Sequence, residues 1–580
     1  MTAPDLEHWE RANRELIAKL LTEFGYEEIL TLSGAVSVPL PGATLTGRAV
    51  RRELGWWRVL PSSLAVEGGG PLPDAAAVFT AVLGAAGAEA STVAGAVAEL
   101  SSTLLTDARQ LAAARPAAEL VDLEPVLVEA ELTGHPWIVA NKGRVGFGAG
   151  DLAAYPPEAR ADVRLLWLAA SPDVADAAGP DHHAVVREQV GDAAFEALRA
   201  GAQLGGLDPS TCVFVPVHPW QWEHRILPLH APQLARGELV FLGEGPARYR
   251  PQLAIRTMTD LDDPARRYLK LPLSILNTSV YRGLPRERTL AAPALTSWLS
   301  SVVDGDAFLP ETGLILLGEL AGVSVAHPVY AGLPGVPYQY TELLGAIWRE
   351  PVQPYLRPGE QAVSLAALLH VDPSGGTFAQ ALVDRSGLPA SEWVARLHAA
   401  VLPPLLHVLY KYGAMFSPHG QNCMIVHRDG VPTRLVVKDF VDDLAICSES
   451  LPEHAGLPPA VRSALADVVL DGKTLRKYLQ NGLLICVYRY LAEICADRLD
   501  VPEATFWGSA RSVLAAYQDR FRGELADRFT LFDLESPTFP KLCLNRLRLF
   551  ERGYTDDPER PVISAVGTVP NPLSPSFAKA

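Results

Sequence analysis

Residues 416–443 read FSPHGQNCMIVHRDGVPTRLVVKDFVDD. Two short apolar runs, 423–426 and 434–437, flank the dipeptide Asp429-Gly430. Asp-Gly favours a tight hairpin turn because both residues tolerate positive φ. The stretch therefore predicts a β-hairpin, and a hairpin brings the residues before its first strand beside those after its second strand.

Polar side chains of several kinds gather at the open end of this hairpin. Those before the first strand are His419, Gln421 and Asn422, and those after the second strand are Lys438, Asp439 and Asp442. Together they provide an imidazole, two amides, an ammonium group and carboxylates. That mixture suits a polyanionic ligand with a divalent metal. The alternative is a solvated hairpin end with ordinary turn chemistry, because short motifs produce false matches.

The composition of the 580-residue chain excludes several classes of protein. Hydrophobic residues make up 48% and charged residues 20%, which is typical of a globular protein. The net charge of −16 argues against a nucleic-acid partner. Neither a signal peptide nor an apolar run of bilayer length is recognisable, so we expect no membrane partner. The six cysteines form no C-x-x-C pair, and buried free thiols in a reducing cytoplasm are expected.

Changes in composition divide the chain into three regions. Residues 1–125 are expected to be mostly helical, with short strand-like pieces after residue 28. Residues 126–390 have short alternating runs and more Pro, Gly and aromatic residues, which indicates an α+β domain. Residues 391–580 combine the hairpin with further helices, and this region is expected to be mainly helical. The apolar residues of 338–350 predict a helix, in which Arg349 is either a ligand contact or, the favoured alternative, a surface charge.

A polar face is predicted between residues 270 and 282. In an extended strand, Lys270, Ser274, Thr278 and Arg282 would point to one side. Two cations around two hydroxyls suit phosphate or carboxylate oxygens, and Arg can bind them through two parallel hydrogen bonds. The alternative is an exposed strand with ordinary polar residues.

Three further cations lie in a glycine-rich stretch. His135 follows Gly134, and Lys142 and Arg144 precede Gly146. Each could bind a carboxylate or phosphate, but for each residue taken alone a surface or structural role is favoured. Further along, His218 in His218-Pro219-Trp220 is expected to be structural, because Pro219 is incompatible with a zinc-binding helix.

Familiar phosphate-binding devices are absent from the sequence. Gly472-Lys473-Thr474 ends like a P-loop, but position 467 is Asp instead of Gly. His427-Arg428-Asp429 mimics a kinase catalytic loop, yet Arg434 stands where that loop needs Asn, and Asp439-Phe440 is followed by Val441 instead of Gly. No Gly-x-Ser-x-Gly elbow occurs, which argues against an α/β-hydrolase.

The order of the motifs is nevertheless distinctive. They are Gly134-His135-Pro136 with Lys142, Arg144 and Gly146-Phe147; His218-Pro219-Trp220-Gln221; Arg256-Thr257; Lys270 through Thr278 to Arg282; and His419-Gly420-Gln421-Asn422 with Lys438-Asp439-Phe440. In this order they resemble the aerobactin-synthetase-like family, the siderophore synthetases that work independently of nonribosomal peptide synthetases (NIS synthetases). The resemblance covers residues 120–545.

The resemblance implies an activity and an architecture. It implies a ligase that uses ATP and Mg²⁺ to adenylate a carboxylate, such as citrate, and joins it to an amine or hydroxyl nucleophile with release of AMP and pyrophosphate. It also implies a multidomain α+β fold likened to a hand with thumb, fingers and palm, a central antiparallel sheet, and a C-terminal part similar to ferric-siderophore reductases. A homodimer is an expected assembly.

The resemblance also implies roles for individual residues. Arg256, Thr257 and Lys270 would hold ATP phosphates, with Asn422 and Asp439 on the nucleotide side and Asp439 near Mg²⁺. The residues expected to face the carboxylate substrate or the reacting phosphate are Thr278, Arg282, His419 and Gln421, with His135, Lys142 and Arg144 as further candidates. Lys270, Arg282 and His419 are the expected catalytic residues.

Three positions depart from the family pattern. Ile138-Val139 stands where many relatives have a second His-Pro, Ala254 where they often have Ser, and Ser417 where they often have Glu. These departures put direct substrate contacts of the first loop in doubt and leave the carboxylate and nucleophile undefined. A second hypothesis is a non-catalytic ferric-siderophore binding or reductase-related protein. The lack of a cysteine cluster for an iron–sulfur centre disfavours it.

Overall fold

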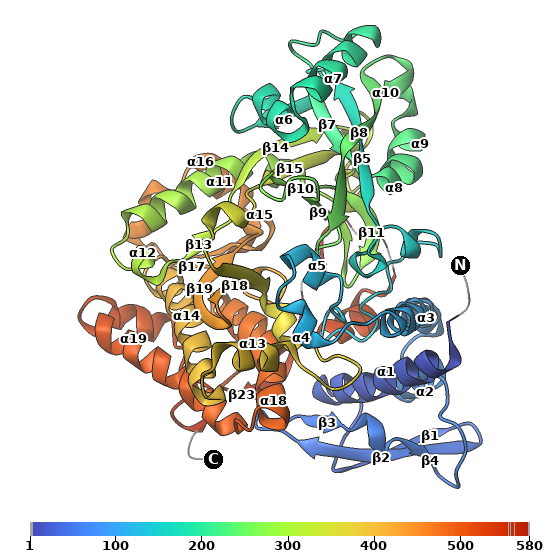
Figure 1. Ribbon diagram of the computed structural model, residues 1–580, viewed down its shortest axis with the longest axis vertical. Coiled ribbons are helices and arrows are strands. Elements are labelled where there is room, and N and C mark those ends of the chain that lie inside the picture. The colour runs from blue at the N-terminus through green and yellow to red at the C-terminus, as the bar shows by residue number, and fades with distance from the viewer. Residues whose placement is uncertain (1–3, 555, 557, 562, 578–580) are drawn as a thin grey trace.

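The computed structural model describes residues 4–554, 556, 558–561 and 563–577. The fold is α+β, as predicted, with 46% helix, 21% strand and several antiparallel sheets. Figure 1 shows an N-terminal part at the lower right, a sheet with helices at the top and a C-terminal helical part at the lower left. None of the described helices is long and apolar enough to cross a membrane.

The N-terminal part has its own hydrophobic core, to which Ile17, Phe24, Val38 and Leu100 contribute. Its strands alternate between buried and exposed side chains, so one face of the sheet lies on the core. The helices are α1 (Leu6–Tyr26), α2 (Ala75–Ala85) and α3 (Ala90–Ala112), and the strands are β1 (Ala35–Leu40), β2 (Ala43–Arg51), β3 (Trp57–Val59) and β4 (Ala65–Val66). Helices and a four-stranded sheet therefore share this region.

An eight-stranded sheet forms the centre of the molecule, in the order β6-β14-β15-β10-β9-β8-β5-β7. All pairs that hold it together are antiparallel. Its strands are β5 (Val163–Ala170), β6 (Ala175–Ala178), β7 (Val213–Val217), β8 (Leu239–Pro251), β9 (Thr257–Asp260), β10 (Tyr268–Lys270), β14 (Glu319–Val325) and β15 (Gly345–Arg349). Helices α6 (His182–Val190), α7 (Asp192–Leu204) and α11 (Arg286–Gly305) pack against it.

Two local predictions in this region were wrong. The predicted helix over 338–350 is instead a short 3₁₀ turn (Tyr338–Tyr340) followed by β15, and Arg349 is fully buried instead of exposed. A run that is buried on both faces has no periodicity that separates strand from helix. The predicted strand over 270–282 is divided into β10, β11 (Leu273–Asn277) and β12 (Val280–Arg282).

The hairpin of residues 423–437 exists as predicted. Strands β18 (Cys423–Arg428) and β19 (Val431–Val437) pair antiparallel, and Asp429 and Gly430 take φ values of 48° and 81° in the turn. At Gly430 a Cβ would approach Leu382 O to 2.3 Å, so the turn requires glycine. Strands β16 (Glu360–Ser364) and β13 (Ile315–Leu316) complete a four-stranded sheet, β13-β19-β18-β16.

Helices dominate the C-terminal part. They include α13 (Phe378–Ser386), α14 (Ala390–Tyr410), α15 (Phe440–Asp443), α16 (Pro459–Ala464), the π-helix η11 (Tyr478–Tyr488), α18 (Arg489–Arg498) and α19 (Glu503–Phe532). Two small sheets contain β17 (Ala414–Met415), β20 (Ala445–Cys447) and β21 (Val469–Leu470), and β22 (Thr538–Leu542) and β23 (Ala565–Pro570). All six cysteines are buried free thiols, as predicted.

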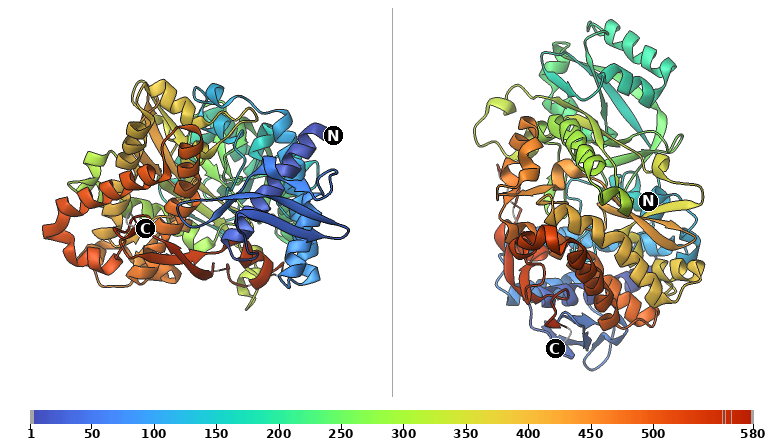
Figure 2. Two further views of the ribbon diagram at one scale, coloured as in Figure 1. Left: turned by 90° about the horizontal axis from the view of Figure 1, so that it is seen from below. Right: turned by 90° about the vertical axis from the view of Figure 1, so that its left-hand side faces the viewer.

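The C-terminal part of the chain packs against the N-terminal part, and both views in Figure 2 show red segments beside blue ones. Lys541 Nζ donates a hydrogen bond to Tyr26 O at 2.9 Å, and Leu549 belongs to the N-terminal core. The buried Arg489 guanidinium binds Glu23 at 2.7 Å and lies over the ring of Tyr26. These contacts hold the C-terminal part beside α1, so residues near position 560 can reach the central sheet.

Candidate active site

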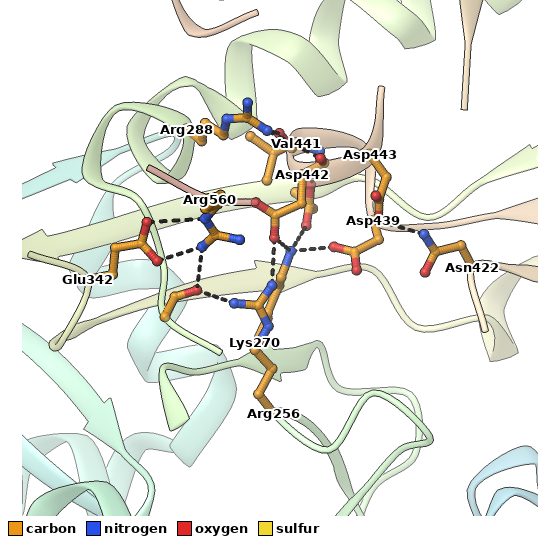
Figure 3. A network of polar contacts seen from close by, with 12 residues as sticks. Arg256, Lys270, Arg288, Glu342, Asn422, Asp439, Val441, Asp442, Asp443 and Arg560 are labelled. Atoms are coloured by element: carbon orange, nitrogen blue, oxygen red, sulfur yellow. Dashed lines mark hydrogen bonds and ion pairs between the residues drawn. The ribbon is translucent and has the colours of Figure 1, made fainter. Parts of the chain in front are cut away.

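The open end of the hairpin meets the central sheet at Asp439. This residue has a left-handed backbone conformation, with φ 72° and ψ 47°, directly before α15. The turn brings the carboxylates of Asp439 and Asp442 to the same ammonium group, that of Lys270. Asp442 Oδ2 lies 2.7 Å from Lys270 Nζ (Figure 3). Segments 169 residues apart in sequence therefore form one ion-pair network.

Two arginines extend this network. Arg256 Nη2 donates to Asp442 Oδ2 at 2.7 Å, and its Nη1 binds Gly283 O. Arg349 Nη2 donates to Asp439 Oδ1 at 2.7 Å and to Glu319 Oε1 at 2.8 Å. Sequence reasoning favoured a surface charge over a ligand contact for Arg349 and missed Glu319, because neither belongs to a recognisable motif. Three cations and three carboxylates thus alternate across the ends of β9, β10, β14 and β15.

Burial and charge act in opposite directions on this network. Burial disfavours the ionised form of Asp439, but Lys270 and Arg349 hold the pKa of its carboxyl well below the usual range. Burial also opposes the charge on Lys270, while Asp439 and Asp442 raise the pKa of that ammonium group above its usual value. Lys270 and Asp439 therefore face each other as a charged pair at neutral pH.

Asp443 stands apart from these pairs. Its Oδ2 accepts a hydrogen bond from Asn422 Nδ2 at 2.7 Å. Burial, together with the negative charges of Asp439 and Asp442, raises the pKa of the Asp443 carboxyl to about 7. This end of the hairpin therefore has more carboxylate than the neighbouring cations neutralise.

Arg282 and Thr278 face each other across the small hairpin of β11 and β12. Thr278 takes a φ of 62° in the turn, and its hydroxyl accepts a hydrogen bond from Arg282 Nη2. The same nitrogen donates to Asn277 O at 2.8 Å. Burial and the charges of Arg256 and Arg560 lower the pKa of Arg282 to about 10. Within the described part of the chain no carboxylate forms a salt bridge with Arg282, so its guanidinium is available to an anion.

Two histidines lie near Arg282. His419 precedes β18, and its Nδ1 accepts the backbone N–H of Gln421 at 3.3 Å. Burial is the largest effect on His419 and lowers its pKa to about 4. Burial, with the positive charges of Lys19, His419 and Arg282, holds the pKa of His135 well below its usual value. Both imidazoles are therefore neutral at pH 7, and the proton of His419 is on Nε2 because Nδ1 accepts.

Lys142 and Arg144 are tied to partners outside the network. Lys142 Nζ binds Asp107 at 2.6 Å and Gln110 at 2.7 Å. Arg144 pairs with Glu158, and both side chains are more than nine-tenths buried. These cations anchor their loop and are not brought to the network around Asp439.

Several buried polar atoms at the site have no hydrogen-bond partner in the described residues. They are Thr257 Oγ1, Asn422 Oδ1 and Arg282 Nε. Buried polar atoms are almost always paired in native proteins, so unpaired ones need an explanation. Each of these three atoms lies on a residue of the hairpin end or the strands that face it, so a polar ligand bound there could supply the missing partners.

A cavity of about 150 Å³ lies a short distance along the strands from the network. Tyr268 and Thr259 line the cavity. Tyr268 lies two residues from Lys270 on the same face of β10, and Thr259 lies two residues from Thr257 on the same face of β9. Lys270 and Thr257 are paired in register, so two residues of extended strand, about 7 Å, separate the network from the cavity. Met424 and Lys438 also line the cavity, and Lys438 Nζ donates a hydrogen bond to Gln252 Oε1 at 3.0 Å.

Comparison with known proteins identifies the family. Residues 126–370 match the model of the IucA / IucC family, and residues 391–557 match that of the ferric iron reductase FhuF-like transporter. The rhizobactin siderophore biosynthesis protein RhbF of Rhizobium meliloti (strain 1021) is 42% identical over 98% of this chain and 96% of its own length. The chain belongs to the IucA/IucC family. It is an NIS siderophore synthetase, as the motif order implied.

Solved structures in this family share the fold. Aerobactin synthetase IucC from a hypervirulent Klebsiella pneumoniae pathotype is 31% identical, with a TM-score of 0.85 over 98% of both chains. The ATP-bound aerobactin synthetase IucA from the same pathotype is 19% identical, with a TM-score of 0.76 over 97% of this chain and 99% of that chain. The match to the FhuF-like model agrees with the predicted likeness of the C-terminal part to reductases.

Proposed function

We propose that this IucA/IucC-family synthetase adenylates a carboxylate with ATP and transfers the acyl group to an amine or hydroxyl nucleophile. The observation that carries the proposal is the buried network of Arg256, Lys270 and Arg349, next to an arginine without a carboxylate partner, Arg282. Buried cations with open hydrogen-bonding positions are suited to bind the phosphates and the carboxylate together. The related fold of IucA was solved with ATP bound, which supports the choice of nucleotide.

The first step would join two anions. A carboxylate oxygen attacks the α-phosphorus of ATP, and the bond to the bridging oxygen of pyrophosphate breaks. Arg282 is proposed to hold the attacking carboxylate, with Thr278 fixing the guanidinium. Arg256 and Lys270 are proposed to face the phosphates, where their charge offsets the repulsion between the reactants.

The second step would release AMP. The nucleophile attacks the acyl carbon, a new C–N or C–O bond forms, and the C–O bond to AMP breaks. His419 is proposed to donate a hydrogen bond from Nε2 to the adenylate, because its Nδ1 already accepts the N–H of Gln421. Gln421 and His135 are proposed to lie along the substrate beside it.

Mg²⁺ fits the oxygen-rich side of the network. Asn422 Oδ1 is buried without a partner, and burial together with the negative charges of Asp439 and Asp442 raises the pKa of Asp443. With Asp439, these residues would hold the ion through oxygen atoms, and bound Mg²⁺ would neutralise charge on the phosphates. The described residues include no group of three or more His, Cys, Asp or Glu side chains able to hold a metal alone. A site shared with the nucleotide is consistent with that finding.

The cavity between β9, β10 and β18 is proposed to receive the nucleoside. Its walls combine the ring of Tyr268 and the apolar side chain of Met424 with the amide of Gln252. A separation of about 7 Å along the strands is comparable with the reach from phosphate to base across a ribose. The base would then stack on apolar surface while the phosphates lie on the network.

Pyrophosphate release tests the proposal. Purified protein with ATP, Mg²⁺, citrate or a related carboxylate, and hydroxylamine or a diamine is expected to release pyrophosphate and AMP. Omission of the carboxylate is the control and should abolish release. Formation of ADP and phosphate instead would refute adenylation. A panel of carboxylates crossed with amines would then identify the substrates.

The FhuF-like match favours a second candidate, the binding of a ferric siderophore by the C-terminal part. Such a protein would change the absorbance of a ferric chelate on titration without consuming ATP. The six cysteines are each buried as free thiols, which disfavours a cysteine-ligated iron–sulfur centre. A cytoplasmic location and a homodimer stay predictions, and light scattering of the purified protein would test the dimer.

A further inference from the structure

Arg560 reaches the network from the far end of the chain. It follows the π-helix η12 (Leu547–Glu551) and precedes β23. Both family matches, over residues 126–370 and 391–557, stop before this position. No motif in the sequence drew attention to it, because it is an isolated arginine in a Pro-rich segment.

The guanidinium of Arg560 is held in a defined orientation. Its Nε and Nη2 donate to the two oxygens of Glu342 at 3.3 and 2.5 Å. Nη2 also lies 3.4 Å from Gly283 O, the carbonyl that accepts from Arg256. The group stands over the ring of Tyr338, 5.3 Å from its centroid.

Close packing around Gly283 fixes this geometry. A Cβ at Gly283 would approach Glu342 O to 2.9 Å, and the Glu342 side chain more closely still. Glycine therefore allows β12 to lie against the segment that carries Glu342. The backbone carbonyl between the two arginines is consequently a rigid part of the site.

One edge of Arg560 is open. Its Nη1 forms no hydrogen bond within the described residues, and the side chain keeps 31% of its surface exposed. Figure 3 shows the free nitrogen pointing toward Asp442, the carboxylate that Arg256 and Lys270 share. The charge of Arg560 also lowers the pKa of Asp442, which agrees with this proximity.

We propose that Arg560 is an anion-binding residue of the active site, which the C-terminal segment supplies to an oxyanion of the substrates. The ligand would be either a phosphate oxygen of the nucleotide or a carboxylate oxygen of the acyl substrate. Glu342 orients the guanidinium, and its free N–H edge donates to the anion as charge-assisted hydrogen bonds. This inference rests on the proposed function, since it concerns the same site.

Binding measurements on the full-length protein test the role of Arg560. Calorimetric titration with tripolyphosphate, MgATP and citrate, each added separately, distinguishes the two sources of the anion. Arg560→Ala is expected to weaken binding of the anion that Arg560 contacts by about 10- to 100-fold, because one or two charge-assisted hydrogen bonds are lost. Arg560→Lys should recover part of that affinity.

A double variant separates binding from a structural role. If Arg560 only neutralises Glu342, then Arg560→Ala combined with Glu342→Gln will restore wild-type affinity, which would overturn the inference. If Arg560 binds the anion, the double variant stays weak. Arg385→Ala is the matched control, because Arg385 is also 31% exposed and pairs with Asp122 outside the network. Its binding should equal that of the wild type.

Failure of this inference is distinguishable from failure of the proposed function. Unchanged affinity of Arg560→Ala for all three probes would refute the role of Arg560, whatever the reaction. Wild-type protein that binds ATP but forms ADP instead of pyrophosphate would refute adenylation, while a weakened Arg560→Ala variant would still support the anion-binding role.

Discussion

Arg282 and Arg349 are both arginines of the candidate site, but they differ in their partners. Arg282 donates to Asn277 O and the Thr278 hydroxyl and has no carboxylate in a salt bridge. Arg349 is fully buried and bound to Glu319 and Asp439. Replacing each by Ala should therefore separate substrate binding from folding stability.

The magnitudes follow from these contacts. Arg282→Ala loses two hydrogen bonds to neutral groups, worth about 1 kcal/mol each, and removes a buried charge that had no counter-ion. Arg349→Ala leaves Glu319 and Asp439 short of a cation, and breaking such a buried pair costs about 3–5 kcal/mol. If the 580 residues unfold as one unit, the unfolding entropy is about 1.2 kcal/mol/K. The free-energy losses then correspond to a fall in melting temperature of about 1–2 °C for Arg282→Ala and about 3–4 °C for Arg349→Ala.

Arg282→Ala should lower activity more than Arg349→Ala does, the reverse of the order expected for the melting temperature. Arg282 offers Nε and Nη1 to the substrate, and two charge-assisted hydrogen bonds at about 1.5–2 kcal/mol each correspond to a loss of about 150- to 900-fold in kcat/KM for the carboxylate. Pyrophosphate release and differential scanning fluorimetry would be measured on both variants. Arg282→Ala with activity within threefold of wild type, or with a melting temperature more than 5 °C lower, would show that Arg282 is structural and refute the reasoning.

Three further predictions concern the hairpin and the cavity. The pKa of the Asp443 carboxyl is raised from its ordinary value to about 7, so the folded state holds this proton more tightly than the unfolded state does. The stability contributed by this group should therefore fall as pH rises from about 4 to about 7, and the melting temperature should fall with it. Asp443→Asn should remove this decline, and a pH profile identical to that of the wild type would contradict the prediction. Met424→Trp should fill the cavity and weaken MgATP by at least tenfold, with tripolyphosphate bound as in wild type; equal loss of both ligands would argue against a nucleoside site. Gly430→Ala should lower the melting temperature, because the added Cβ would meet Leu382 O at 2.3 Å and the backbone has a φ of 81°. Gly456→Ala is the control, because a Cβ at Gly456 would lie in open space.

Local sequence was sufficient for the hairpin and for the types of residue at its end. Asp429-Gly430 specifies the turn through two positive φ values, and the apolar runs on either side supply the strands. The order of short motifs indicated the NIS synthetase family, which a 42% identical relative over 98% of the chain confirms. These features depend on residues close together in sequence or on a pattern that the whole chain carries.

Other parts of the site could not be predicted, because their partners are distant in sequence. Arg349 lies in a strand buried on both faces, whose apolar residues resemble those of a buried helix. Its carboxylate partner Asp439 is 90 residues away, and Arg560 is 218 residues from Glu342. Lys142 had the residue type of a ligand, yet the fold gives its charge to Asp107.

The sequence by itself thus determined the family, the hairpin and the reactive side chains at its open end. Only the tertiary structure decided which charges neutralise one another and which remain available to a ligand. The physical reason is that a buried charge needs a partner, and several carboxylates and cations compete for that role once the chain is folded. Among the described residues, Arg282 keeps an unpartnered Nε, and the free edge of Arg560 points toward Asp442, so both stay open to a ligand after this competition.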